Sequence, residues 1–263
     1  AAGRVPCSRA TGKLLFPARE VHAWLAGNSH GKAISKPNVF LGSHDPLLEW
    51  ALRQSECGLA TFFDGSLDGL DRMQAGEGIA AGIHIYDAAQ DIWNTPAVTD
   101  RFSVENAVLV HFAKRARGLV LGKGLTGKIQ KLADLRGHRF VPRQPQSGST
   151  VLLRDLLKRA NLDDTALTFT EPARSEQDAV LRVAAGEADA TLGLGALAQQ
   201  FGLDFLPLIS EDFDLLMDRK AYFDPPLQTF LAFLQSRSFR KHAGDGAGDS
   251  YDVARCGTIV WNG

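Results

Sequence analysis

The sequence is poor in cysteine, with only Cys7, Cys57 and Cys256 among 263 residues. Their number is odd and none forms a CxxC pair, which argues against a disulfide framework and a zinc site. No apolar run approaches the roughly 20 residues that a membrane-spanning helix needs. The first residues lack the basic-then-apolar order of a signal peptide. We therefore expect a cytoplasmic chain, although a mature exported protein would also lack a signal peptide.

Motifs of common enzymes are missing as well. The sequence contains no GxSxG elbow, P-loop, GxGxxG fingerprint or HExxH. Ser43, His44 and Asp45 have the residue types of a hydrolase triad, but adjacent residues cannot converge as a triad must. No metal-ligand spacing relates the histidines His22, His30, His111, His138 and His242. We expect no enzymatic activity, no metal site and no cofactor.

Charge is distributed unevenly along the chain. Residues 1–36 hold six basic residues and only one acidic residue, a balance of +5, while the whole chain carries −1. The remaining residues therefore carry −6. This asymmetry suggests that the N-terminal end meets a polyanion and that the rest does not.

From residue 39 onward, short apolar runs alternate with segments of helical periodicity, which predicts a parallel α/β architecture. Residues 105–113 and 117–124 are two strand candidates that could carry the chain from one lobe to another. We expect the basic residues between them, Lys114, Arg115 and Arg117, to form a solvated turn. The alternative is that one of them reaches a ligand cleft. Residues 203–210 and 213–219 are two further strand candidates.

Two turns at the ends of predicted strands carry hydroxyl groups. The first is Gly42-Ser43-His44-Asp45-Pro46 and the second is Asp64-Gly65-Ser66. Ligands of open α/β sheets bind beyond the carboxyl ends of the strands. The alternatives are that Ser43 or Asp45 only caps a helix and that the second segment is only a turn. His84, in the apolar run GIHIYD, is either a ligand contact or a core residue.

The strongest local signal is the segment 143–150, RQPQSGST, where a strand delivers an arginine to a helix start. Arginine offers five donors and no acceptor, which suits carboxylates and tetrahedral oxyanions. The hydroxyls of Ser147, Ser149 and Thr150 and the helix N-terminus add further donors. The alternative is a capped helix beside a solvated Arg143.

Five segments form an ordered set that extends over most of the chain. They are GSHDPLLEWAL, FFDGSLDGLDRMQAGEGIAAGIHIYD, RFVPRQPQSGSTVLLRDLL, AAGEADATLGLGALAQQFGLDFLPL and EDFDLLM. Together they resemble the periplasmic-binding-protein-like domain of bacterial regulators, which is similar to type II molybdate- and tungstate-binding proteins. The resemblance covers roughly residues 37–260. It implies a two-lobed α/β fold with a hinge and an inter-lobe cleft.

Residues 3–26, GRVPCSRATGKLLFPAREVHAWLA, resemble the end of an excisionase-type or MerR-like helix-turn-helix domain, with its wing hairpin and following helix. The helices that precede the wing in such domains are missing, so the resemblance implies a truncated regulator. We assign residues 1–26 to this partial DNA-binding domain, 27–38 to a linker and 39–263 to the ligand-binding domain. Within it, lobe one comprises 39–112 and 203–263, and lobe two comprises 113–202.

The resemblance also implies the ligand-binding residues. Tungstate-type binders use an arginine followed by Ser-Gly-Thr, whereas this chain has Ser-Gly-Ser, which keeps the hydroxyl. Pro145 stands where an aspartate is often found. The predicted ligand-binding set is Ser43, His44, Ser66, His84, Arg143, Gln144, Ser147, Gly148, Ser149 and Thr150.

These observations predict a cytoplasmic, ligand-responsive transcriptional regulator. Its C-terminal module would close on a small anion, molybdate or tungstate, and its N-terminal domain would bind DNA, in a homodimer. One alternative is an exported solute-binding protein of an oxyanion importer, against which the wing-like residues 3–26 argue. A second alternative is an enzyme or accessory protein of molybdenum-cofactor metabolism, against which the missing acid/base set argues.

Overall fold

The computed structural model describes residues 5–10, 12–17, 20–21, 24, 36–103, 106–163, 165–245 and 250–263. The chain forms two compact units, residues 1–36 and residues 37–263. In the first unit, β1 (Ser8–Ala10) pairs antiparallel with β2 (Lys13–Leu15). This hairpin lies within the predicted wing. Most of the predicted helix and linker that follow lie outside the described residues, so the DNA-binding assignment stays a prediction.

In the second unit, the first lobe contains three parallel strands in the order β5, β3, β4. They are β3 (Val39–Gly42), β4 (Ala60–Phe63) and β5 (Ala80–Ile83). The helices that follow them are α2 (Pro46–Gln54), α3 (Ser66–Gln74) and α4 (Thr95–Phe102). The hairpin of β6 (Tyr86–Asp87) and β7 (Ile92–Trp93) precedes α4. The predicted alternation of strands and helices is confirmed in this lobe.

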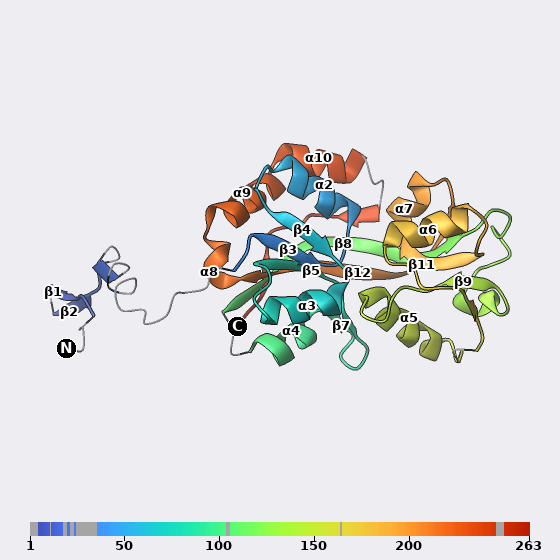
Figure 1. The fold of residues 1–263 in the computed structure, drawn as a ribbon, viewed down its shortest axis with the longest axis horizontal. Coiled ribbons are helices and arrows are strands. Elements are labelled where there is room, and N and C mark those ends of the chain that lie inside the picture. Colours follow the sequence, from blue (N-terminus) through green and yellow to red (C-terminus); the bar gives the residue numbers. More distant parts are fainter. Residues whose placement is uncertain are drawn as a thin grey trace. The chain divides into compact units, whose positions relative to one another are not determined.

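The second lobe repeats the parallel arrangement in the order β10, β9, β11. Its strands are β9 (Arg139–Val141), β10 (Thr168–Phe169) and β11 (Ala190–Leu194). Its helices are η1 (Leu132–Leu135), α5 (Gly148–Arg159), α6 (Glu176–Ala184) and α7 (Gly195–Gln200). The side chain of Ser147 caps α5, and that of Ser175 caps α6. Figure 1 shows the two lobes side by side.

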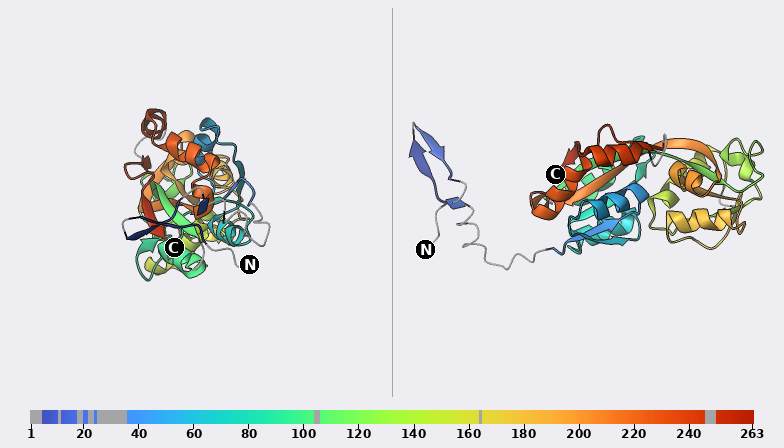
Figure 2. Two further views of the ribbon diagram at one scale, coloured as in Figure 1. Left: turned by 90° about the vertical axis from the view of Figure 1, so that its left-hand side faces the viewer. Right: turned by 90° about the horizontal axis from the view of Figure 1, so that it is seen from above.

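Two long antiparallel strands, β8 (Ala107–Leu121) and β12 (Asp204–Asp218), run through both lobes (Figure 1, and from above in Figure 2). Residues 117–121 of β8 pair with β11, whereas residues 214–217 of β12 pair with β5. The strand candidates 105–113 and 117–124, predicted with a turn between them, therefore form one continuous strand, and the candidates 203–210 and 213–219 form another. Residues 204–209, which the sequence predicts for lobe one, pair with residues 117–121 of β8, the part that also pairs with β11.

The C-terminal segment returns to the first lobe. Its elements are α8 (Arg219–Tyr222), α9 (Pro225–Leu234), α10 (Arg237–Asp245), β13 (Tyr251–Asp252) and β14 (Ile259–Asn262). Both short strands pair with β8. Separate apolar cores fill the two lobes, centred on residues such as Phe40 and Phe230 in the first and Leu135 and Phe140 in the second. No helix in the described ranges is long and apolar enough to cross a membrane.

Candidate functional site

A narrow pocket lies where the two lobes meet. Its lining is Ser43, His44, Phe63, Asp64, Gly65 and His84 from lobe one, and Arg143, Ser147, Arg174, Ser175 and Glu176 from lobe two. The cavity volume is about 20 Å³, and this is enough for about one water molecule. Any larger ligand therefore requires the lobes to move apart before it enters.

Direct contacts hold the lobes together beside this pocket. The amide Nε2 of Gln144 donates to the backbone oxygen of Asp64 at 2.8 Å, and the backbone N–H of Leu67 donates to the oxygen of Gln146 at 3.2 Å. Gly148 lies so close to the carbonyl of His84 that a Cβ on it would stand 2.2 Å from that oxygen. The absence of a side chain at Gly148 therefore permits this closed arrangement.

The N-cap residues of three helices line the pocket. Gly65 precedes α3, Ser147 precedes α5 and Ser175 precedes α6. The first turn of a helix has N–H groups without a partner inside the helix and about half a positive charge, and both favour an anion. The helices come from both lobes, so their positive ends converge on one pocket. This arrangement favours an anionic ligand without a metal ion, and no metal-ligating cluster occurs in the described ranges.

A pair of buried hydroxyls forms one wall of the pocket. The Oγ atoms of Ser43 and Ser66 lie 2.8 Å apart, and Ser66 Oγ also accepts from the backbone N–H of His84 at 3.0 Å. One of the two hydroxyl protons is used between the serines. When Ser66 donates to Ser43, the hydroxyl proton of Ser43 is available to a ligand in the pocket. Ser43 lines the pocket itself, and Ser66 lies behind it.

Beneath the pocket, an ion-pair network runs through the hinge strands. Arg115 and Arg117 of β8 are 1% and 0% exposed, so the expected solvated turn is wrong for both, whereas Lys114 is exposed. Arg115 pairs with Asp45 at 2.7 Å and with Glu211 of β12. Arg117 pairs with Glu211 at 2.8 Å and with Glu176 at 3.1 Å. Turn prediction failed because burial of these arginines depends on carboxylates that are distant in sequence.

Two carboxylates of this network, Glu176 and Glu211, have pKa values below their usual range. Burial alone would raise the pKa of Glu176, but Arg117 and Arg143 outweigh it and lower the pKa to about 2. Burial also acts to raise the pKa of Glu211, but Arg115 and Arg117 outweigh it, so this pKa lies well below its usual range. The pKa of His84 is lowered by burial, against the opposing influence of Glu211, so this imidazole is neutral at pH 7.

Arg143 lines the pocket, but its donors are already engaged. Its Nε donates to the oxygen of Ala173 at 3.1 Å, its Nη2 donates to the oxygen of Arg174 at 2.8 Å, and its Nη1 lies 3.0 Å from Glu176. Burial lowers the pKa of Arg143, and Glu176 only partly offsets this effect. In this structure Arg143 therefore holds the segment before α6 rather than presenting an unpaired charge.

The other predicted residues divide into two groups. Ser43, His44, His84, Arg143 and Ser147 line the pocket. Those that lie beside or behind it are Ser66, Gln144, Gly148, Ser149 and Thr150. The hydroxyl of Ser149 donates to Glu176 at 2.7 Å, and that of Thr150 donates to the backbone oxygen of Arg143 at 2.9 Å. Whether any of the set contacts a ligand stays a prediction.

The predicted ligand-binding set contains no residue of the segment Arg174-Ser175-Glu176, which also lines the pocket. Its only local signal is the helix start: Ser175 is followed by Glu176 and Asp178 in the first turn of α6. The segment comes close to the strand that leads to Ser147 because β9 and β10 are parallel neighbours, and their pairing continues in a bridge between Arg143 and Ala173. That proximity depends on strand order, which one sequence does not show.

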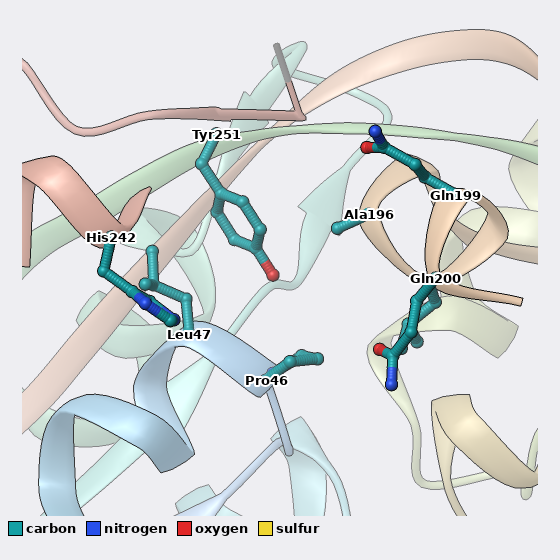
Figure 3. Close-up of a pocket in the computed structure, with 8 residues that line it drawn as sticks. Pro46, Leu47, Ala196, Gln199, Gln200, His242 and Tyr251 are labelled. Carbon is teal, nitrogen blue, oxygen red and sulfur yellow. The ribbon is translucent and has the colours of Figure 1, made fainter. Parts of the chain in front are cut away.

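A larger pocket, with a volume of about 350 Å³, lies between α2 and α7. Figure 3 shows it, with the Tyr251 hydroxyl directed into it; its lining is Pro46, Leu47, Ala196, Leu197, Gln199, Gln200, His242 and Tyr251. Tyr251 donates to Asp45 at 2.7 Å, so the hinge network reaches this pocket as well. Since its lining among the described residues includes no Lys or Arg, it is the weaker candidate for an anion.

Comparisons with known proteins agree on the fold. The effector-binding domain of QuiR, solved with shikimate, has a TM-score of 0.54 at 15% identity and covers 78% of this chain and 96% of that one. A putative L-cystine ABC transporter from Listeria monocytogenes has a TM-score of 0.54 at 12% identity, with coverages of 81% and 97%. The GluR0 ligand-binding core with L-glutamate has a TM-score of 0.52 at 12% identity, with coverages of 83% and 100%. These similarities confirm the predicted two-lobed type II fold.

Sequence comparison identifies the family. The uncharacterized protein YvgK of Bacillus subtilis (strain 168) is 28% identical over 192 residues, which are 70% of this chain and 62% of that protein. The chain therefore spans less than two thirds of the length of this relative. Residues 49–235 match the PBP superfamily domain. The chain belongs to the PBP superfamily.

Proposed function

We propose that this domain binds a small oxyanion, molybdate or tungstate, in the pocket between its lobes. The observation that carries the proposal is the convergence of three helix N-termini, capped by Gly65, Ser147 and Ser175, on one pocket. The spare proton of the Ser43–Ser66 pair adds a directed donor. An oxyanion with several acceptor oxygens could use all of these groups together.

A thermal-shift series with molybdate, tungstate, sulfate, phosphate and small carboxylates tests the ligand class. A ligand at 100 times its Kd stabilises the folded state by about 2.7 kcal/mol. We expect a large shift with molybdate or tungstate and none with sulfate. If only carboxylates shift the transition, the ligand is an organic anion; if none does, the proposal is wrong.

The variant Ser43→Ala localises the binding. It removes a hydroxyl that lines the pocket, and a hydrogen bond to a charged group contributes about 1.5–3 kcal/mol. We therefore expect the affinity for the active oxyanion to fall at least about tenfold in calorimetric titration. Ser103→Ala is the matched control, because Ser103 is exposed at the end of α4. Equal affinities in both variants would place the ligand elsewhere.

We further propose that the domain is the sensor of a cytoplasmic, DNA-binding transcriptional regulator. The basic balance of residues 1–36, the hairpin of β1 and β2, and the separation of the two units support this proposal. The fold of the QuiR effector-binding domain is compatible with it. Fractionation of cells that produce the native protein tests the compartment. Recovery outside the cytoplasm would instead support the exported solute-binding alternative.

A further inference from the structure

The positive charges of the buried arginines around the pocket are balanced by carboxylates. Arg115, Arg117 and Arg143 face the three carboxylates of Asp45, Glu176 and Glu211. The six formal charges cancel. An anion that entered the pocket would therefore gain little net attraction from this network, and the positive charge that attracts it must come from elsewhere.

Arg174 is different from these three residues. It lines the same pocket and is exposed. Its guanidinium has no ion pair or hydrogen bond with any residue that the structure describes. Its backbone, in contrast, is held firmly: the N–H donates to Asp178 at 3.3 Å, and the oxygen accepts from Arg143 at 2.8 Å. A fixed backbone thus presents a free cationic side chain at the pocket.

The place of Arg174 in the sequence adds to this effect. It stands directly before Ser175, whose side chain caps α6 by accepting from the N–H of Asp178 at 2.9 Å. Its charge therefore lies at the positive end of a helix dipole. On the opposite lobe, Asp64 also lines the pocket and repels an anion from that side. The electrostatic attraction for an anion is consequently concentrated on the second lobe.

We propose that Arg174 supplies the positive charge that pairs with the bound oxyanion, and that Arg143 is a positioning residue that holds the Arg174 backbone. This inference rests on the proposed oxyanion binding. The planar guanidinium can donate two parallel hydrogen bonds to two oxygens of one anion. Exposure of Arg174 also gives it access to the anion before the lobes close.

Calorimetric titration tests the role of Arg174. The titrant is molybdate, or whichever of tungstate, sulfate and phosphate stabilises the chain most. We expect Arg174→Ala to weaken binding at least about tenfold. Arg174→Lys should weaken it less, because lysine keeps the positive charge but lacks the planar N–H donors of the guanidinium. Asp64→Asn should strengthen binding severalfold. Arg154→Ala is the control, since Arg154 is an exposed arginine of α5 outside the pocket lining.

The possible outcomes separate the two proposals. If the unmodified chain binds an oxyanion and Arg174→Ala binds it equally well, the role of Arg174 is refuted and the proposed function stands. If no oxyanion binds the unmodified chain, both fail. A salt titration gives a second measurement: the affinity of the unmodified chain should fall more steeply with ionic strength than that of Arg174→Ala, because an exposed charge pair is screened. Equal slopes would contradict the inference.

Discussion

Arginines lie both on the hinge strand β8 and at the exposed rim of the pocket, where Arg174 stands, but in opposite settings. At the hinge, Arg115 and Arg117 are almost fully buried, and each faces two carboxylates. At the rim, Arg174 is exposed, and its guanidinium has no partner in the described part of the chain. Burial of an ion costs several kcal/mol unless a partner compensates. The paired arginines therefore serve the structure, and the exposed one is available to a ligand.

Glu211 is the centre of the hinge network. Its two oxygens face Arg115, which contacts Asp45 in lobe one, and Arg117, which contacts Glu176 in lobe two. A single carboxylate on β12 thus links charges that belong to both lobes. Arg143 also pairs with Glu176, so three arginines and three carboxylates are neutral as a set and tolerate burial, but the loss of any member leaves a charge uncompensated.

The largest effect is expected from Glu211→Gln. It leaves Arg115 and Arg117 with one carboxylate fewer inside the protein, and loss of one partner of a buried pair costs about 3–5 kcal/mol. The free energy of unfolding, measured with denaturant, should fall by that amount. Asp212→Asn is the control on the adjacent residue, since Asp212 pairs with the partly exposed Lys114 at 3.6 Å and should cost less than about 1 kcal/mol. Equal losses in both variants would remove the distinction between buried and exposed pairs.

An intermediate effect is expected from Arg143→Ala. This change removes two hydrogen bonds to the backbone of residues 173 and 174 and one ion pair to Glu176. Hydrogen bonds of charged groups contribute about 1.5–3 kcal/mol, so a loss of about 2–3 kcal/mol in unfolding free energy is expected. Arg174→Ala should change it by no more than about 0.5 kcal/mol, as for other exposed sites. If Arg174→Ala is as destabilising as Arg143→Ala, the rim arginine is structural after all.

The sequence predicted the fold better than the site. Strand and helix periodicity, together with ordered motifs such as RFVPRQPQSGST, indicated the two-lobed α/β fold that the structure confirms. The N-cap signals of Ser147 and the strand-end position of Ser43 placed both at the pocket. These are local patterns, and local patterns can be read from one sequence.

The pairing of charges could not be read in the same way. Lys114, Arg115 and Arg117 look like a solvated turn in the sequence. The carboxylates that make burial of the two arginines possible are at the distant positions 45, 176 and 211. The sequence predicts Arg143 as the charge that meets the anion, because nothing local shows that Glu176 lies 3.0 Å from it. Register between β8 and β12 places Glu211 opposite Arg115, and register is a property of the folded sheet.

The smallest effect is expected from a change of one pH unit, and it tests whether the hinge charges are paired as the structure shows. Glu176 has a pKa of about 2 in the folded chain, below its usual value of 4.5. Its contribution to stability is therefore fully present above pH 4.5 and is lost as the pH falls toward 2, by at most about 1.4 kcal/mol per pH unit. Glu176→Gln should have a shallower decline of unfolding free energy in this window than the unmodified chain. Glu187→Gln, on the exposed surface of the same lobe, should keep the full slope. A slope unchanged by Glu176→Gln would mean that this carboxylate is not held ionised by Arg117 and Arg143, and the contrast between hinge and rim would lose its electrostatic basis.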